Sequence, residues 1–350
     1  ELQQSNFDLF NWPYFTGAGQ RFRVRAQYGL QRQDFTLSLT EPWFMGYKVS
    51  VGGEFYYHAA TFLSSVYSQS NLGGALQARK ALTPFTALRG EYRLENIKIY
   101  NLTGNYGNGQ GVTEQQQQQG AIQNAGNSSP YTKSCLLGGL DFDNRDSLFL
   151  TRRGQSVNFT TFIAGGGLGG NVQDYGLNLE AKKYFPLPWD MILLTKGSVG
   201  VVNTWGSGTK GGTNTPPIFD ELYLGGANDM RGFSFREVGP KDFYGNPVGG
   251  STSVYGTAEL TFPIIPRLRG AIFTDWGWVN ANSWDFSPAS VTTSANGLSY
   301  TSGGLNGDVG IGARIELPIG PIRIDWGYPV MCDSWNRSNG QFNFNVGYTF

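Results

Sequence analysis

The last nine residues, 342–350, alternate between apolar and polar side chains without a break. One set of alternate positions is apolar and mostly aromatic: Phe342, Phe344, Val346, Tyr348 and Phe350. The positions between them hold asparagine, glycine and threonine. Successive side chains of a β-strand point to opposite faces, so the segment is predicted to be a strand with one apolar wall and one small, polar wall. Such a strand at the end of a chain favours a membrane β-barrel over a soluble sandwich.

The same alternation recurs along the chain, and its polar faces carry charges of both signs. Residues 21–28 place three arginines opposite an apolar row. Residues 309–317 and 322–328 each place acidic and basic side chains opposite apolar rows. A wide barrel encloses a water-filled interior, which side chains of both signs can line through ion pairs. The pattern therefore predicts a barrel with a polar lumen.

Turn residues divide the chain into about fifteen alternating runs. The connections are of two lengths. Short turns lie at 41–46, 82–85, 185–189, 262–267 and 317–321, and long polar loops lie at 101–132, 205–250, 280–305 and 330–340. Short turns on one rim and long loops on the other are typical of bacterial outer-membrane barrels, whose long loops face outside. Because such barrels have an even number of strands, the odd count predicts that a first strand is missing.

The composition fits this all-β fold class and excludes others. The chain has 50 glycines, 15% aromatic residues and 15% charged residues, with a mean hydropathy of -0.30. No apolar run reaches the roughly 18 residues that a membrane helix needs, which excludes a helical membrane protein. A barrel hides its apolar residues in alternation, so a hydrophilic average is compatible with it. The net charge of zero gives no general attraction to nucleic acid, and no nucleic-acid partner is expected.

Residues for metal or bond-making chemistry are scarce. The two cysteines, Cys135 and Cys332, and the single histidine, His58, cannot assemble the usual zinc site. We therefore expect no metal, no cofactor, no catalytic residue and no enzymatic activity. Both cysteines fall on the predicted outer side, where an oxidising envelope permits a disulfide. They belong to strands well apart along the wall, so the sequence leaves a Cys135–Cys332 bridge open.

Several segments together resemble one known family. Residues 224–233, which contain Met230-Arg231-Gly232-Phe233 and are followed by Val238-Gly239-Pro240, are similar to the signature loop of the BamA family of outer-membrane protein insertases. Residues 141–146, with Arg153-Gly154, and residues 318–329 resemble two further blocks of that family. Residues 341–350 resemble its last strand. The resemblance covers the chain from its second predicted strand to its end.

The resemblance implies a sixteen-stranded transmembrane antiparallel barrel. Residues 1–350 would form one barrel domain, corresponding to strands two to sixteen, with the first strand and the periplasmic POTRA domains absent from this chain. The loop at about 205–250, called the signature loop below, would fold into the lumen and pair its arginine with acids on the inner wall.

The signature loop supplies the first candidate site, Arg231, Gly232 and Phe233. An arginine inside a barrel needs acidic partners, because its guanidinium carries five donors and cannot lose its charge. Asp275 is the first choice, since it matches the F-x-D-x-G motif of the family. Glu259 is the second choice and Asp325 the third. The alternative is that Arg231-Gly232-Phe233 is only a turn followed by a strand.

The last strand supplies the second candidate site, a seam at which the barrel can open: Phe342, Phe344, Val346, Gly347, Tyr348 and Phe350. Gly347 matches the position at which the last strand of the family can kink. Glycine weakens a strand interior, because it has no side chain to pack and costs backbone entropy. Gly347 could equally be only a small inward residue.

The function implied is that of an assembly factor in the outer membrane of a Gram-negative-type bacterium, which folds and inserts other β-barrels through a weak seam between its first and last strands. The implied partners are unfolded outer-membrane protein clients, outer-membrane lipids and the accessory lipoproteins of an assembly complex. A two-partner secretion pore or a translocation-assembly transporter with the same loop is the alternative. A simple diffusion porin gives no reason for the arginine loop.

Overall fold

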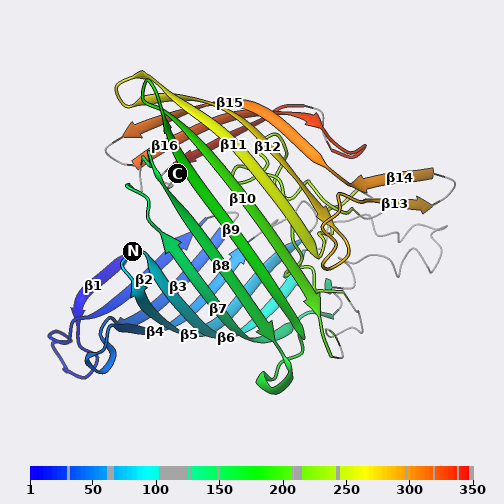
Figure 1. The fold of residues 1–350 in the computed structure, drawn as a ribbon. Coiled ribbons are helices and arrows are strands. Elements are labelled where there is room, and N and C mark those ends of the chain that lie inside the picture. The colour runs from blue at the N-terminus through cyan, green and yellow to red at the C-terminus, as the bar shows by residue number, and fades with distance from the viewer. Residues whose placement is uncertain are drawn as a thin grey trace. The chain divides into compact units, whose positions relative to one another are not determined.

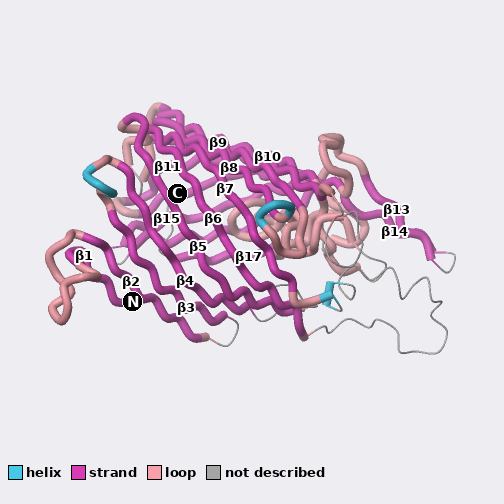
Figure 2. The backbone as a smooth tube through the Cα atoms, turned by 90° about the horizontal axis from the view of Figure 1, so that it is seen from below, coloured by secondary structure: helices cyan, strands magenta, loops and turns pink. Residues whose placement is uncertain are grey.

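The computed structural model describes residues 1–29, 32–60, 67–101, 125–126, 128–147, 150–206, 208, 215–241, 245–295, 298–317, 320–336 and 339–346. Almost all of the regular structure in these ranges is β-strand (Figures 1 and 2). No helix in the described ranges is long and apolar enough to cross a membrane. Gly347, Tyr348 and Phe350 of the predicted seam lie outside the described residues.

The main sheet has 15 strands, whose hydrogen-bonded order follows the chain except that β15 follows β12. Its strands are β1 (Leu2–Phe7), β2 (Gln20–Tyr28), β3 (Arg32–Glu41), β4 (Val49–Ala60), β5 (Ser68–Thr83), β6 (Thr86–Tyr100), β7 (Tyr131–Asp143), β8 (Gly154–Ala164), β9 (Asp174–Leu187), β10 (Met191–Thr204), β11 (Thr252–Ile265), β12 (Leu268–Asn280), β15 (Asn306–Leu317), β16 (Gly320–Met331) and β17 (Gln341–Val346). The strand count and the alternation of short turns with long loops follow the sequence pattern.

The chain divides into two compact units. The first unit comprises residues 1–141, 160–176 and 204–217, and the second comprises residues 142–159, 177–203 and 218–350.

In the first unit, β1 to β6 pair as successive antiparallel neighbours. Alternate side chains on one face are large, apolar and exposed, as Phe55 and Leu76 are. The opposite face holds polar groups that bond one another: Glu95 accepts hydrogen bonds from Tyr56 and Asn71 over 3.2 and 3.1 Å. This division is the one that alternation predicts for a strand with lipid on one side and water on the other.

In the second unit, β11, β12, β15, β16 and β17 pair as antiparallel neighbours, with register shifts at Pro263/Ile265 and Gly307/Asp308. Their outer face carries exposed apolar side chains: Ile272, Trp276, Val309, Ile311, Trp326, Tyr328, Phe342 and Phe344. The other face, called the loop-side face below, carries the charged residues: Glu259, Asp275, Asp308, Arg314, Arg323 and Asp325. Five of these, Glu259, Asp275, Asp308, Arg314 and Asp325, are at most 5% exposed.

One expectation from the sequence is wrong. Residues 280–305 were expected to be a long polar loop, but they contain a hairpin of β13 (Ser290–Ala295) and β14 (Leu298–Gly303), which pair with each other and not with the main sheet. Figure 1 shows this hairpin extending beyond the ends of β12 and β15. Its sequence is polar but rich in threonine, which suits strands, so polarity alone did not distinguish a hairpin from a loop.

The two cysteines are not joined in the structure. Cys135 is buried on β7, whereas Cys332 is exposed just after β16.

Candidate functional site: the Arg231 loop on the sheet

The signature loop connects β10 to β11 and forms a tight turn around Arg231. Leu224 and Val238 close the turn by exchanging two backbone hydrogen bonds. Gly225 follows with φ +112, a conformation that side chains rarely adopt, so glycine is required there. The Asp229 carboxylate accepts hydrogen bonds from the backbone N–H groups of Gly225 and Met230, over 2.9 and 2.7 Å. These bonds hold the turn that presents Arg231 to the sheet.

Arg231 is buried, with 2% of its surface exposed. Its Nε and Nη2 donate to the two carboxylate oxygens of Asp275 over 2.8 Å each, and its backbone N–H donates to the same carboxylate over 3.1 Å. Nη1 donates to Glu259, and Nη2 also donates to the Thr257 hydroxyl over 3.1 Å. Asp325 lies 3.7 Å from Nη1. The guanidinium therefore binds two carboxylates directly and is near a third.

A second arginine, Arg314 on β15, links the acids of two other strands. Its Nη2 donates to both oxygens of Glu259 over 2.8 Å, and its Nη1 donates to Asp325 over 2.6 Å. Arg323 donates to the other oxygen of Asp325. Glu259 is thus shared by Arg231 and Arg314. A buried charge that lost its partner would be costly, so each member of this network depends on the others.

Phe273 and a pair of glycines complete the contact between loop and sheet. The Arg231 guanidinium carbon lies 3.4 Å from the centroid of the Phe273 ring, within the range of a cation–π contact. The Gly232 N–H donates to Asp308 over 2.8 Å. A Cβ on Gly327 of β16 would lie 2.6 Å from the Gly232 nitrogen. The loop backbone therefore lies directly on the backbone of β16.

Phe233 anchors the turn from its apolar side. It is 1% exposed and belongs to a buried cluster that unites the loop with the sheet: Leu224, Met230, Phe233, Val238, Tyr255 and Val279. The Tyr255 hydroxyl also donates to the backbone carbonyl of Asp229 over 2.9 Å. The turn is thus held by apolar packing as well as by the ionic network.

The last strand also bonds the loop. Asn343 of β17 donates from Nδ2 to the Arg231 carbonyl over 2.8 Å. The Ser234 hydroxyl donates to the Gln341 side-chain oxygen over 3.4 Å. Phe342 and Phe344 point to the other face, where they are 60% and 56% exposed. The alternation of this strand therefore places its amides on the loop and its aromatic rings outward.

Burial and charge act in opposite directions on the loop's ionisable groups. Burial lowers the pKa of Arg231, but Asp275, Glu259 and Asp325 outweigh it and raise that pKa well above its usual value. Burial raises the pKa of the Asp229 carboxyl to about 6, against the backbone hydrogen bonds that it accepts. Burial, with Asp220 alongside, raises the pKa of Glu221 to about 8. Arg231 thus stays charged, whereas burial makes the ionised forms of Asp229 and Glu221 unfavourable.

Sequence reasoning named Arg231 and the three acids but missed four residues that bind the same turn or its partners: Asp308, Arg314, Arg323 and Asn343. Asp308 and Arg314 lie six residues apart on β15, an even spacing that puts both side chains on the face opposite the apolar row of residues 309–317. The alternation of β15 therefore contained the signal that these two side chains face the loop. Alternation does not show which acid each arginine binds.

An antiparallel sheet with an apolar outer face, and with a buried arginine loop bound to its other face, defines a transmembrane outer-membrane β-barrel of the Gram-negative type. The chain belongs to the Omp85 superfamily, whose domain model matches residues 15–350.

Individual relatives agree with this membership. The outer membrane protein assembly factor BamA of Neisseria meningitidis serogroup B is 27% identical over 208 residues, which are 52% of this chain and 24% of that protein. The factor of the same name from Nitratidesulfovibrio vulgaris is 21% identical over 343 residues, which are 95% of this chain and 38% of that protein. This chain therefore spans well under half of the length of either relative.

A solved structure has the same fold. The crystal structure of BamA from Haemophilus ducreyi lacking POTRA domains 1-3 superposes with a TM-score of 0.75 at 19% identity, covering 96% of this chain and 65% of that chain.

Proposed function

We propose that this chain is the barrel of an outer-membrane protein assembly factor, which helps other β-barrels to fold and insert through a weak seam that includes its last strand. The contact that supports this most directly is the hydrogen bond from Asn343 of β17 to the Arg231 carbonyl. Through it, the loop that is anchored on β11, β12 and β15 also holds the strand at the end of the sheet. Movement of β17 would then displace the loop, and movement of the loop would displace β17.

The physical task of such a factor is to lower the cost of bringing unpaired strand edges into hydrocarbon. Each unsatisfied backbone group there costs several kcal/mol. A strand edge that opens offers its own N–H and C=O groups as a template for an incoming strand. No covalent bond is made or broken in this process, so the chain is not an enzyme in the usual sense.

Within this proposal the residues have distinct roles. Arg231, Gly232 and Phe233 lock the loop to the sheet, and Asp275, Glu259 and Asp325 receive the arginine. The seam comprises Phe342, Phe344, Val346, Gly347, Tyr348 and Phe350, with Gly347 as a point of weakness. The partners would be unfolded barrel clients, outer-membrane lipids and accessory lipoproteins, and POTRA domains would precede the barrel in the whole protein.

The test uses the full-length protein as the sole copy in its host. Asn343→Ala removes the bond to the loop, and Asn345→Ala is the matched control on the same face of β17. We expect Asn343→Ala to lower the levels of outer-membrane barrels several-fold and Asn345→Ala to leave them near normal. Equal barrel levels in the two strains, with equal amounts of folded protein, would reject the coupling.

Depletion of the whole protein distinguishes the alternative. Loss of many different barrels on depletion supports an assembly factor. Loss of one secreted protein, with barrel levels unchanged, would instead identify a two-partner secretion or translocation pore and overturn the proposed function.

A further inference from the structure

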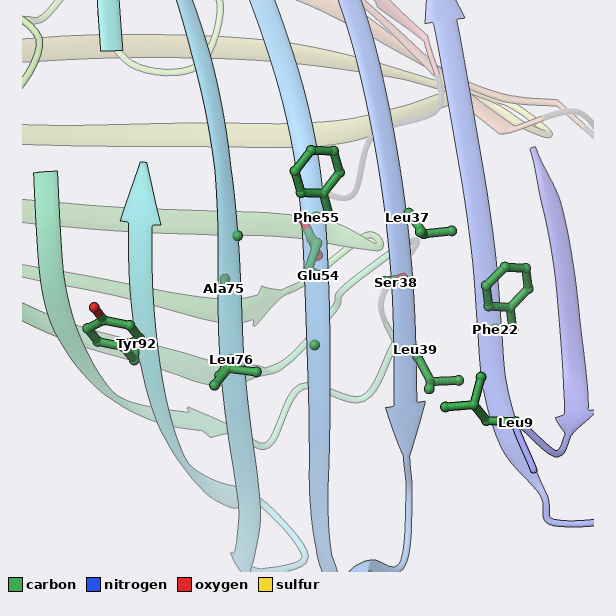
Figure 3. A pocket seen from close by; sticks show the side chains of 12 residues that line it. Leu9, Phe22, Leu37, Ser38, Leu39, Glu54, Phe55, Ala75, Leu76 and Tyr92 are labelled. Carbon is green, nitrogen blue, oxygen red and sulfur yellow. The ribbon is translucent and has the colours of Figure 1, made fainter. Parts of the chain in front are cut away.

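The first unit carries an apolar groove of about 470 Å³ on its outer face. Its lining comes from β2 to β6 and from the turn between β1 and β2 (Figure 3). Two rows of paired residues cross these strands side by side. One row is Phe22, Leu39, Gly53, Leu76 and Tyr92, and the next is Val24, Leu37, Phe55, Gly74 and Leu94. The groove exists because each row contains one glycine among large apolar residues.

The two glycines lie diagonally on neighbouring strands. Gly53 pairs with Leu76, and Gly74 pairs with Phe55. A Cβ at Gly53 would lie 3.6 Å from Leu76, and one at Gly74 would lie 3.5 Å from the Glu54 carbonyl, which are ordinary contacts. Neither position therefore requires glycine for its backbone or for close packing. Larger side chains would fit, and their absence leaves a channel between Phe55 and Leu76.

The groove leads toward a lysine. Past Gly74 on the same face of β5 come Leu76, Ala78 and Lys80, and Lys80 pairs with Val49 of β4. Ala78 pairs with Gly90 of β6, so small residues lie on the surface between the groove and Lys80. Lys80 is exposed, beside the short turn that joins β5 to β6. Short turns mark the periplasmic rim of outer-membrane barrels.

The distances match one leaflet of a membrane. Six residues separate Gly74 from Lys80, or about 20 Å along a strand. With strands tilted by about 40°, this is about 15 Å along the membrane normal. The hydrocarbon core is about 30 Å thick, so the span from Gly74 to Lys80 equals about half of it. A chain in the groove would thus reach the membrane centre while a head group stood beside Lys80.

We propose that this groove binds a two-chain phospholipid of the periplasmic leaflet, with one acyl chain over Gly53 and Gly74 and with its phosphate at Lys80. The lining is apolar except for Ser38 and Glu54, which stand at the alternate strand positions whose side chains point to the other face. An apolar lining that faces the lipid suits an acyl chain, and the positive side chain at the rim suits a phosphate. The Tyr92 hydroxyl bonds Ser134 over 2.9 Å, which fixes the ring as one wall of the groove. The site would hold a lipid on the strands at the N-terminal end of the sheet.

The test measures retained lipid by native mass spectrometry of the full-length protein in detergent, with added phosphatidylglycerol. The double variant Gly53→Leu, Gly74→Leu fills the groove. Gly138→Leu is the control, because Gly138 lies between the exposed Leu136 and Leu140 on β7 and a Cβ there makes an ordinary contact of 3.5 Å. Since lipid affinity rises with each buried CH₂, we expect the double variant to retain lipid at least about tenfold less tightly and the control to match wild type.

The phosphate is tested separately. Lys80→Glu should weaken phosphatidylglycerol but leave diacylglycerol of the same chains unchanged. Lys183→Glu is the control, since Lys183 lies on β9 beside Phe185 and away from the groove residues in sequence and lining. If Lys80→Glu lowered the retention of both lipids equally, Lys80 would not be the phosphate ligand, and the head-group assignment would be overturned.

A variant that fails to fold does not end the test. Gly74→Ala adds one methyl group and should lower lipid retention by a smaller, measurable factor. Unchanged retention in Gly74→Ala and in the folded double variant would overturn the proposal. Equal loss in Gly138→Leu would also overturn it, because the retained lipid would then be general boundary lipid. Displacement of the lipid by a strand peptide of alternating pattern would assign the groove to a client instead.

Discussion

Gly232 of the signature loop and Gly327 of β16 meet backbone to backbone, so that a Cβ on Gly327 would lie 2.6 Å from the Gly232 nitrogen and 2.7 Å from the Arg231 carbonyl carbon. The Gly232 N–H is the donor that binds Asp308. Any side chain at 327 would therefore lift the loop from the sheet at the residue next to Arg231. The contact makes Gly327 part of the site that anchors the loop, although Gly327 lies far beyond Gly232 in the sequence.

Gly327→Ala is expected to loosen the loop while the barrel still forms. Overpacking of a close contact costs about 1–3 kcal/mol, which raises the equilibrium constant for loop opening by about 5- to 150-fold. Hydrogen exchange of the peptide spanning 224–238 measures this. Gly307→Ala on β15 is the control, because a Cβ there meets atoms only at 3.5 Å or more. Identical exchange in the two variants would contradict the close contact.

Arg231→Met is expected to destabilise the protein by about 3–5 kcal/mol, because Asp275 and Glu259 would remain buried without their common partner. Urea unfolding in detergent micelles measures the loss. Arg236→Met is the control in the same loop: Arg236 lies over the Tyr223 ring at 4.3 Å and is only partly buried. A loss of less than about 1 kcal/mol for Arg231→Met is typical of an exposed ion pair. It would show that the buried acids do not depend on Arg231 for their stability.

Arg231 and Arg314 are expected to be coupled through Glu259, which binds both. In a double-mutant cycle with Arg231→Met and Arg314→Met, the effects on unfolding free energy should depart from additivity by about 0.5–3 kcal/mol. Arg152→Met serves as the comparison, since Arg152 pairs with Asp190 and shares no partner with Arg231. Additivity within about 0.5 kcal/mol for Arg231 and Arg314 would argue against a shared acid.

The anchorage of the loop is expected to weaken with rising pH through Asp229. Its pKa is raised from 3.8 to about 6, so the folded state binds the proton more tightly than the unfolded state does. The stabilisation is therefore fully present below pH 3.8 and is lost as pH rises to about 6. Asp229→Asn can still accept the two backbone hydrogen bonds and should remove this pH dependence. Hydrogen exchange of residues 224–238 between pH 4 and 7, corrected for intrinsic rates, measures it. An unchanged slope in Asp229→Asn would contradict the assignment.

The architecture was largely readable from the sequence because it depends on local periodicity. Alternation is a property of a single strand, so the apolar and polar faces of residues 309–317 and 322–328 followed without knowledge of their neighbours. Turn and loop lengths predicted the order of strands, since short connections join adjacent antiparallel strands. The same approach failed at β13 and β14, because these short strands lie in a stretch rich in serine and threonine that was expected to be a loop.

The site divides along the same line. By itself, the sequence determined that Arg231 needs acidic partners, that Asp275, Glu259 and Asp325 were the candidates, and that Phe342 and Phe344 face away from the polar side. Only the tertiary structure decided that Arg314 shares Glu259, that Asp308 receives the Gly232 N–H, that Gly327 must lack a side chain, and that Asn343 holds the Arg231 carbonyl. These contacts join residues from about 55 to 112 positions apart. Their geometry depends on the register of every intervening strand, and a shift by one residue would turn each side chain to the other face.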